Sequence, residues 1–283
     1  MPEDVKNVVG VSEALYLRPL LYGLRDSATG PQLLVDFPSQ LALKLQKRTN
    51  GLRCAFLSPI DYARHGGDYC IVPGVCASSA TSSDTIRLFI NPNVRNIETL
   101  AVDIRVTSEI ILAKIILMEK FPNFSAKRGG LQFIPMLPHP GQMLQKADAA
   151  LVVNFHPEEH KTNEPFAIDL VDEWYDLTGL PYVHGIWVGH DEDESEKVAE
   201  QLVQAREQGV SHLGDIADAL AAEHKLAKPA GLEYLSRFSY DLSNPEQDAL
   251  MEFMKYAYYH GVLPDVPNLN YFDIEAPPSP PVN

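Results

Sequence analysis

The 283-residue chain lacks several features that would assign it to a large class of proteins. It has no stretch near the ~18 consecutive apolar residues that span a bilayer, so we expect no transmembrane helix. Its 23 basic residues stand against 38 acidic ones, and a net charge of −15 disfavours binding to nucleic acid or to anionic membranes. No basic region followed by a long apolar run stands near its start, so we expect no signal peptide and a cytoplasmic location.

Cysteine is scarce, and no metal site is expected. Cys54, Cys70 and Cys76 are odd in number and their spacing matches no zinc motif, which indicates reduced thiols. His156 and His160 have the i, i+4 spacing of helical metal ligands, but Pro157 interrupts a shared helical face. The composition, 45% hydrophobic and 22% charged, is typical of globular proteins.

The segment 147–188 organises the rest of the chain. It opens with an apolar run, Ala149–Val153, which predicts a strand buried on both faces. A polar segment begins at Asn154, and a second apolar run, 182–188, completes the block. Strands and helices alternate along the chain, including an apolar helix expected at 109–121. This alternation predicts an α/β fold with largely parallel sheets, in which ligands bind at the carboxyl ends of strands.

The order of the elements predicts two lobes. Helices expected after residue 188 have no strands of their own and must pack on the first unit. We therefore expect residues 1–98 and 189–275 to form one lobe and 99–188 the other, with a ligand cleft between them. The Pro-rich end, 276–283, predicts a disordered tail.

Hydroxyl groups near the expected cleft are the first candidates for binding an anion. Two expected helix starts, one after Ser39 and one after Thr107 and Ser108, lie on different units. Each offers free backbone N–H groups that can hold a carboxylate, and the alternative is plain helix capping. A small-residue loop adds further hydroxyls; its alternative is a solvent-exposed turn. His184 lies within an apolar run, where a core histidine is the alternative to a substrate contact. The binding candidates are Ser39, Ser58, Ser78, Ser79, Thr81, Thr107, Ser108 and His184.

Several short motifs, taken in order and spacing, resemble one enzyme family. They are YLRPLLYGL (16–24), PSQLA (38–42), YCIVPGVC (69–76), TS (107–108), DAALVV (148–153) and DLVDEWYDLTGLP (169–181). Together they are similar to chorismate dehydratases of the futalosine route to menaquinone, over about residues 8–263.

The resemblance implies a fold, a reaction and a set of site residues. It implies a two-lobed, type II periplasmic-binding-protein-like fold and the conversion of chorismate to 3-[(1-carboxyvinyl)oxy]benzoate and water. No cofactor or metal is implied, and the expected partner is the dicarboxylate alone, bound by a monomer or homodimer. The family's usual Asn stands as Arg18 here, and its usual Ile-Gly-Asp gives way to Val153-Asn154-Phe155.

These departures leave two functions open. One is a dehydratase with a rearranged site in which Arg18, Asn154 and His156 are the catalytic residues. Arg18 would bind a carboxylate, and His156 would accept a proton, the alternative for His156 being a plain loop residue. The other is a non-catalytic or differently specific protein that binds small carboxylates on the same fold.

Overall fold

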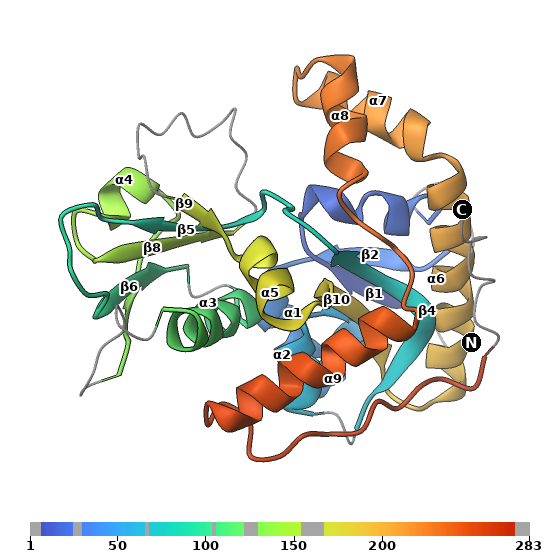
Figure 1. Cartoon of the computed structure of the whole chain (residues 1–283). Coiled ribbons are helices and arrows are strands. Elements are labelled where there is room, and N and C mark those ends of the chain that lie inside the picture. The colour runs from blue at the N-terminus through green and yellow to red at the C-terminus, as the bar shows by residue number, and fades with distance from the viewer. Residues whose placement is uncertain are drawn as a thin grey trace.

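The computed structural model describes residues 7–24, 30–65, 68–103, 106–121, 130–153 and 167–274. Within them the chain forms two α/β lobes, shown at right and left in Figure 1, each built on a five-stranded sheet. The first sheet has the order β2-β1-β3-β10-β4 and the second the order β7-β6-β8-β5-β9.

The first sheet combines parallel and antiparallel pairs. β1 runs parallel to β2 and β3, whereas β10 is antiparallel to both β3 and β4. β10 is buried along all eight of its residues, which explains its continuous apolar sequence. The strands are β1 (Val8–Val11), β2 (Gln32–Val35), β3 (Leu52–Leu57), β4 (Cys70–Ser79) and β10 (Tyr182–Gly189).

Helices from both ends of the described chain cover this sheet. α6 packs on β3 and β4, and α9 packs on β10 and α2. Ser243 and Glu246 form a capping box that begins α9, and Gly209 lets α6 approach η2, because a Cβ there would lie 1.8 Å from the Pro19 carbonyl oxygen. The helices are η1 (Leu15–Leu17), η2 (Pro19–Leu21), α1 (Pro38–Gln46), η3 (Thr49–Gly51), α2 (Pro59–Ala63), α6 (Asp193–Ser211), α7 (Leu213–Glu223), α8 (Lys228–Leu235) and α9 (Asn244–Tyr259).

The second lobe is smaller. β6 pairs parallel with β7 and β8, and β5 pairs antiparallel with β8 and β9. Its strands are β5 (Ile86–Ile90), β6 (Thr99–Val102), β7 (Gln132–Pro135), β8 (Ala149–Val153) and β9 (Ala167–Asp169), and its helices are α3 (Ser108–Glu119), α4 (Pro140–Met143) and α5 (Leu170–Thr178).

The lobe boundaries differ from those expected at 98/99 and 188/189. β5 belongs to the second sheet and β10 to the first, so the chain crosses between the lobes after β4 and again after β9. An apolar run buried on both faces does not indicate which sheet it joins, because its partners are distant in sequence. The tail expected at 276–283 lies outside the described residues.

The two lobes share a hydrophobic core where the chain crosses. Trp174 of α5 makes edge-on ring contacts with Tyr182 of β10 and with Phe253 and Tyr256 of α9. The same core cluster includes Leu112 of α3. Burial of such large rings stabilises the junction and holds the lobes in a defined relation. No helix among the described residues is both long and apolar enough to cross a membrane.

Candidate functional site

A pocket of about 510 Å³ lies between the lobes at the carboxyl ends of five strands. Residues 12–14, 16 and 35–38 line it from the first lobe, following β1 and β2. Asp103, Val106, Glu109, Pro138 and Val153 line it from the second lobe, at or after the ends of β6, β7 and β8. This is the position that open α/β sheets give to ligands. We call it the interlobe pocket.

Two helix starts border the interlobe pocket from opposite lobes. Phe37 and Pro38 stand at the start of α1, and Val106 and Glu109 flank the start of α3. Both helix starts carry the partial positive charge of the helix dipole. The Phe37 N–H donates to Asp36 Oδ1 at 2.8 Å, and the N–H groups of Thr107 and Glu109 contact the Glu109 carboxyl group. Ser39 is half-buried and lies one residue beyond the lining, and the N-cap residue of α1, Phe37, makes no capping hydrogen bond with its side chain. Its binding role stays a prediction.

The hydroxyls of Ser58, Thr107 and Ser108 join the two lobes. Ser58 and Thr107 each donate to Asp61 Oδ2 at 2.7 Å, and the Ile60 N–H donates to Ser108 Oγ at 3.2 Å. These contacts connect the start of α2 in the first lobe with the start of α3 in the second. Burial raises the pKa of Asp61, and the two hydroxyl donors oppose that rise. The three hydroxyls are thus engaged within the protein, and substrate binding by them stays a prediction.

Ser78 and Ser79 do not lie in a loop, as their small neighbours suggested, but in strand β4, where both are buried. Ser78 Oγ donates to Glu246 Oε1 at 3.4 Å, and Ser79 Oγ shares a hydrogen bond of 3.0 Å with His184 Nε2. The strand extends this far because β10 pairs with it to Ser79. Thr81, beyond the strand, is exposed.

His184 lies behind the wall of the interlobe pocket. Its ring centroid is 5.2 Å from that of Tyr16, which lines the pocket, and 5.1 Å from that of Tyr182. Burial lowers the pKa of His184 to about 3, so the imidazole is neutral at physiological pH. The structure thus places His184 in the core, one layer from the pocket, and direct substrate contact by it stays a prediction.

Arg18 lies outside the interlobe pocket, contrary to the expectation from sequence. It lines a separate pocket of about 210 Å³ between η2 and α7, and its Nη2 is 2.9 Å from Glu223 Oε1. Arg18 stands at the junction of η1 and η2, and residues two apart on a 3₁₀ turn point in widely different directions. Tyr16 therefore faces the interlobe pocket while Arg18 faces α7.

Asn154 and His156, the other two expected catalytic residues, lie outside the described residues. Val153, which ends β8 and precedes Asn154 in sequence, lines the interlobe pocket. The catalytic roles of Asn154 and His156 stay predictions.

Glu109 is the pocket residue that sequence reasoning missed. It stands in the first turn of α3, only 9% of it is exposed, and burial raises its pKa to about 7. The nearby charge of Asp61 raises this pKa further, while backbone N–H groups of Glu109 and Thr107 oppose the rise. An acidic residue after a cap typically lies on a solvated helix start, so the sequence pattern favoured an exposed position.

The described part of the pocket wall is acidic. It carries Glu13, Asp36, Asp103 and Glu109, and no Lys or Arg stands among the described lining residues. Lys44 forms an ion pair with Asp36 and lowers its pKa. An anionic ligand therefore gains most from the helix starts and from a protonated Glu109.

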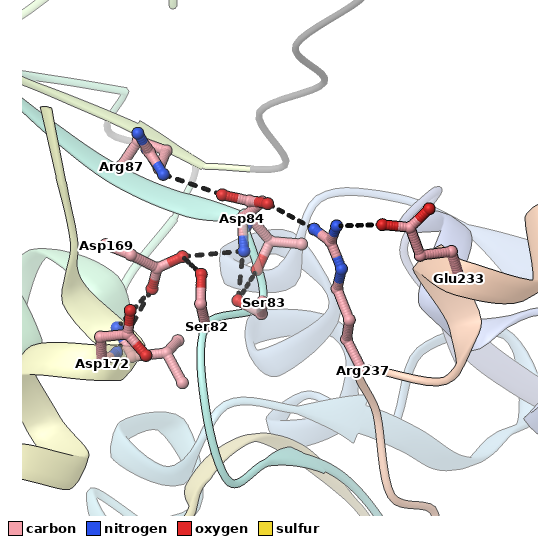
Figure 2. Close-up of polar contacts among 10 residues, drawn as sticks. Ser82, Ser83, Asp84, Arg87, Asp169, Asp172, Glu233 and Arg237 are labelled. Carbon is pink, nitrogen blue, oxygen red and sulfur yellow. Dashed lines mark hydrogen bonds and ion pairs between the residues drawn. The ribbon is translucent and has the colours of Figure 1, made fainter. Parts of the chain in front are cut away.

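A second polar cluster, the hinge cluster, joins the two crossing segments (Figure 2). Asp169 accepts hydrogen bonds from Ser82 Oγ and from the N–H of Asp84, each at 2.8 Å, and also caps α5. Asp84 pairs with Arg87 of β5 and with Arg237, which follows α8 in the first lobe. The members of the hinge cluster are Ser82, Asp84, Arg87, Asp169, Glu233 and Arg237.

Metal-ligating side chains do not gather anywhere in the described ranges. No group of three or more His, Cys, Asp or Glu with metal-binding geometry occurs there. The three cysteines are buried free thiols, and burial raises the pKa of each.

Comparison with known proteins places the chain in a family. The model of a family described as menaquinone biosynthesis matches residues 8–259. The chain belongs to the menaquinone biosynthesis family. A curated relative is the chorismate dehydratase of Thermus thermophilus, 25% identical over 256 residues, a match that covers 87% of this chain and 93% of the relative.

Solved structures of other proteins have the same fold as this chain. A Candida albicans protein with the generic periplasmic binding protein fold superposes with a TM-score of 0.68 at 11% identity, covering 96% of this chain and 98% of that protein. An alkanesulfonate-binding protein of Xanthomonas axonopodis pv. citri, bound to MOPS, gives a TM-score of 0.60 at 13% identity, covering 95% and 98%. The expected two-lobed periplasmic-binding-protein-like fold is confirmed.

Proposed function

We propose that this protein is a chorismate dehydratase of menaquinone biosynthesis and that the interlobe pocket holds the substrate. The observation that carries the proposal is the match to a curated chorismate dehydratase along 87% of the chain. The pocket supports it, because a volume of about 510 Å³ lies in the range of small-molecule sites.

The reaction makes few chemical demands on the protein. Removing the C3 hydrogen and the C4 hydroxyl of chorismate yields an aromatic ring, so the thermodynamic drive is in the substrate. The protein must hold two carboxylates, position a group that accepts the C3 proton and help hydroxide to leave. The starts of α1 and α3 lie on opposite walls of the interlobe pocket, and the partial positive charge of each helix start favours a bound carboxylate.

The expected catalytic residues fit this proposal unequally. Asn154 directly follows Val153 of the pocket wall in sequence and keeps its place as a candidate, as does His156. The ion pair of Arg18 with Glu223 argues against its contact with a ligand in the interlobe pocket. The cytoplasmic location and the monomeric or homodimeric state stay predictions.

A second function, binding of a small carboxylate without turnover, has one observation in its favour. The arginine that replaces the family's Asn lies outside the interlobe pocket. The fold suits this role too, since one similar structure is an alkanesulfonate-binding protein.

Incubation of the purified protein with chorismate separates the two functions. A dehydratase will form 3-[(1-carboxyvinyl)oxy]benzoate, detected by ultraviolet absorbance and mass, at a rate proportional to protein concentration. Heat-treated protein is the control. Thermal stabilisation by chorismate without product would favour the binding function, and neither effect would reject both.

A further inference from the structure

Glu109 is a buried acid in the wall of a pocket. Glu109 lines the interlobe pocket, and only 9% of the residue is exposed. No ion pair joins it to another described residue; instead, backbone N–H groups at the start of α3 contact its carboxyl group. A carboxyl group in such a place can hold or release a proton close to a bound ligand.

The burial of Glu109 is costly when its carboxyl group is charged. Burial of a carboxylate costs free energy that contacts with backbone N–H groups offset only in part, and a neutral side chain of the same size would avoid that cost. Burial raises the pKa of Glu109 to about 7, so both protonation states are populated near neutral pH. A proton-transfer group works best when its pKa lies near the working pH.

The geometry of chorismate allows one group to carry out both proton transfers. The enolpyruvyl ether at C3 and the hydroxyl at C4 are trans on the ring. The C3 hydrogen and the C4 hydroxyl therefore lie on the same face. One carboxyl group facing that side of the ring reaches both.

We propose that Glu109 is the catalytic residue that moves the proton from C3 of chorismate to the departing C4 hydroxyl. This inference rests on the proposed function. The Glu109 carboxylate takes the C3 proton, and the electrons of the C–H bond form the new ring double bond. The C4–O bond breaks with its electron pair, and the carboxylic acid returns its proton to the oxygen. One water leaves, and Glu109 ends as the carboxylate with which it began.

Neighbouring groups set how the reaction depends on pH. Tyr16 and Tyr182 face Glu109 and stay neutral, because burial raises the pKa of each well above 10.0. His184 behind them is neutral as well, with a pKa of about 3. The other charged groups of the surroundings are Asp61, Glu13, Asp36 with Lys44, and Asp103. Since the reaction starts from the Glu109 carboxylate, kcat/KM will rise with pH through about 7.

The test compares Glu109→Gln with Glu119→Gln. Both changes replace a glutamate of α3 by its neutral isostere, but Glu119 ends the helix and is exposed. Glu109→Gln is expected to lower kcat by about 10²- to 10⁴-fold, the usual contribution of a positioned acid–base group, and to abolish the rise of kcat/KM with pH. At pH 6, where most of the wild-type Glu109 is protonated and both side chains are neutral, its dissociation constant for chorismate will change little. Glu119→Gln will keep kcat within about twofold, as surface substitutions do.

Each outcome separates the inference from the function on which it rests. A folded Glu109→Gln variant with unchanged kcat, or with a raised KM alone, overturns the inference while wild-type turnover upholds the function. A wild-type protein without turnover rejects the function and the inference together. Should Glu109→Gln fail to fold, Glu109→Asp decides: a lower kcat that keeps the pH dependence supports the role, and an unchanged kcat overturns it.

Discussion

Asp169 and Glu109 are both buried carboxylates at helix starts where the two lobes meet, yet their surroundings differ. Asp169, 7% exposed, accepts hydrogen bonds from Ser82, Asp84, Val171 and Asp172. Glu109, 9% exposed, has a few backbone N–H groups on one side and the interlobe pocket on the other. Both carboxylates are buried near a helix start, and what differs is how far protein donors occupy the carboxyl group.

This difference separates a structural acid from a chemical one. Donors that surround a carboxylate stabilise its charge and fix its orientation, so Asp169 holds the two crossing segments together (Figure 2). A carboxyl group that faces a cavity has free oxygen lone pairs and a pKa that burial raises to about 7. The comparison predicts opposite effects when each is neutralised.

The largest expected effect on stability is that of Asp169→Ala. The change leaves the donors of Ser82, Asp84 and Val171 without their acceptor and removes the cap of α5. It should lower the free energy of unfolding by about 4 kcal/mol, measured by urea denaturation. Asp172→Ala, in the same helix turn but exposed, is the control and should cost under about 1 kcal/mol. Equal losses in both variants would contradict the structural role.

Glu109→Gln should have the opposite sign, and only at high pH. The folded protein holds the Glu109 proton up to about pH 7, whereas the unfolded chain loses it near 4.5, so wild-type stability falls as pH rises between these values. Removing the charge should therefore make the variant more stable than wild type at pH 8 by up to about 3 kcal/mol, with little difference at pH 4. Denaturation at both pH values measures this. A variant that is less stable at pH 8 would show that Glu109 has a structural role like that of Asp169.

The fold was more predictable from sequence than the site was. The strand Ala149–Val153 was expected at those bounds, and the helix expected at 109–121 is α3 (Ser108–Glu119). Such long or strongly apolar segments carry their own signal. The sheet that β10 joins was not predictable, because its partners β3 and β4 are far away in sequence and its residues are buried on both faces.

The site was harder to predict because a sequence does not show in which direction each side chain points. That strand ends would meet at the pocket followed from the α/β pattern, and Val153 lies there. Tyr16 and Arg18, two residues apart, face different pockets because 3₁₀ turns flank Arg18. Glu109 stands in the first turn of α3, where acidic residues are commonly solvated, but in the structure it is buried.

Arg237 tests how far the hinge cluster contributes beyond Asp169. Its guanidinium pairs with Asp84 across the lobes, and both side chains are about one-third exposed, at 30% and 31%. Arg237→Gln should therefore lower the free energy of unfolding by only about 1 kcal/mol, and the loss should shrink at high salt. A double-mutant cycle with Asp84→Asn isolates the pair. A coupling energy above about 3 kcal/mol would show that Arg237 contributes about as much to the free energy of unfolding as Asp169 does.

The smallest expected effect is that of Arg18→Ala. This change tests whether Arg18 binds the substrate, as the sequence predicted, or lies outside the interlobe pocket, as in the structure. If Arg18 gripped a substrate carboxylate, its loss would weaken chorismate binding by about 1.5 to 3 kcal/mol. In the structure Arg18 pairs with Glu223, whose side chain is 54% exposed, and lines the pocket beside α7. Exposed pairs contribute under about 1 kcal/mol, so stability should change little. Calorimetry should find chorismate affinity unchanged, and Glu223→Gln, which breaks the same ion pair, should behave alike. A tenfold loss of affinity in Arg18→Ala alone would instead require the first lobe to rearrange when the ligand binds, with Arg18 released from Glu223 to reach the interlobe pocket.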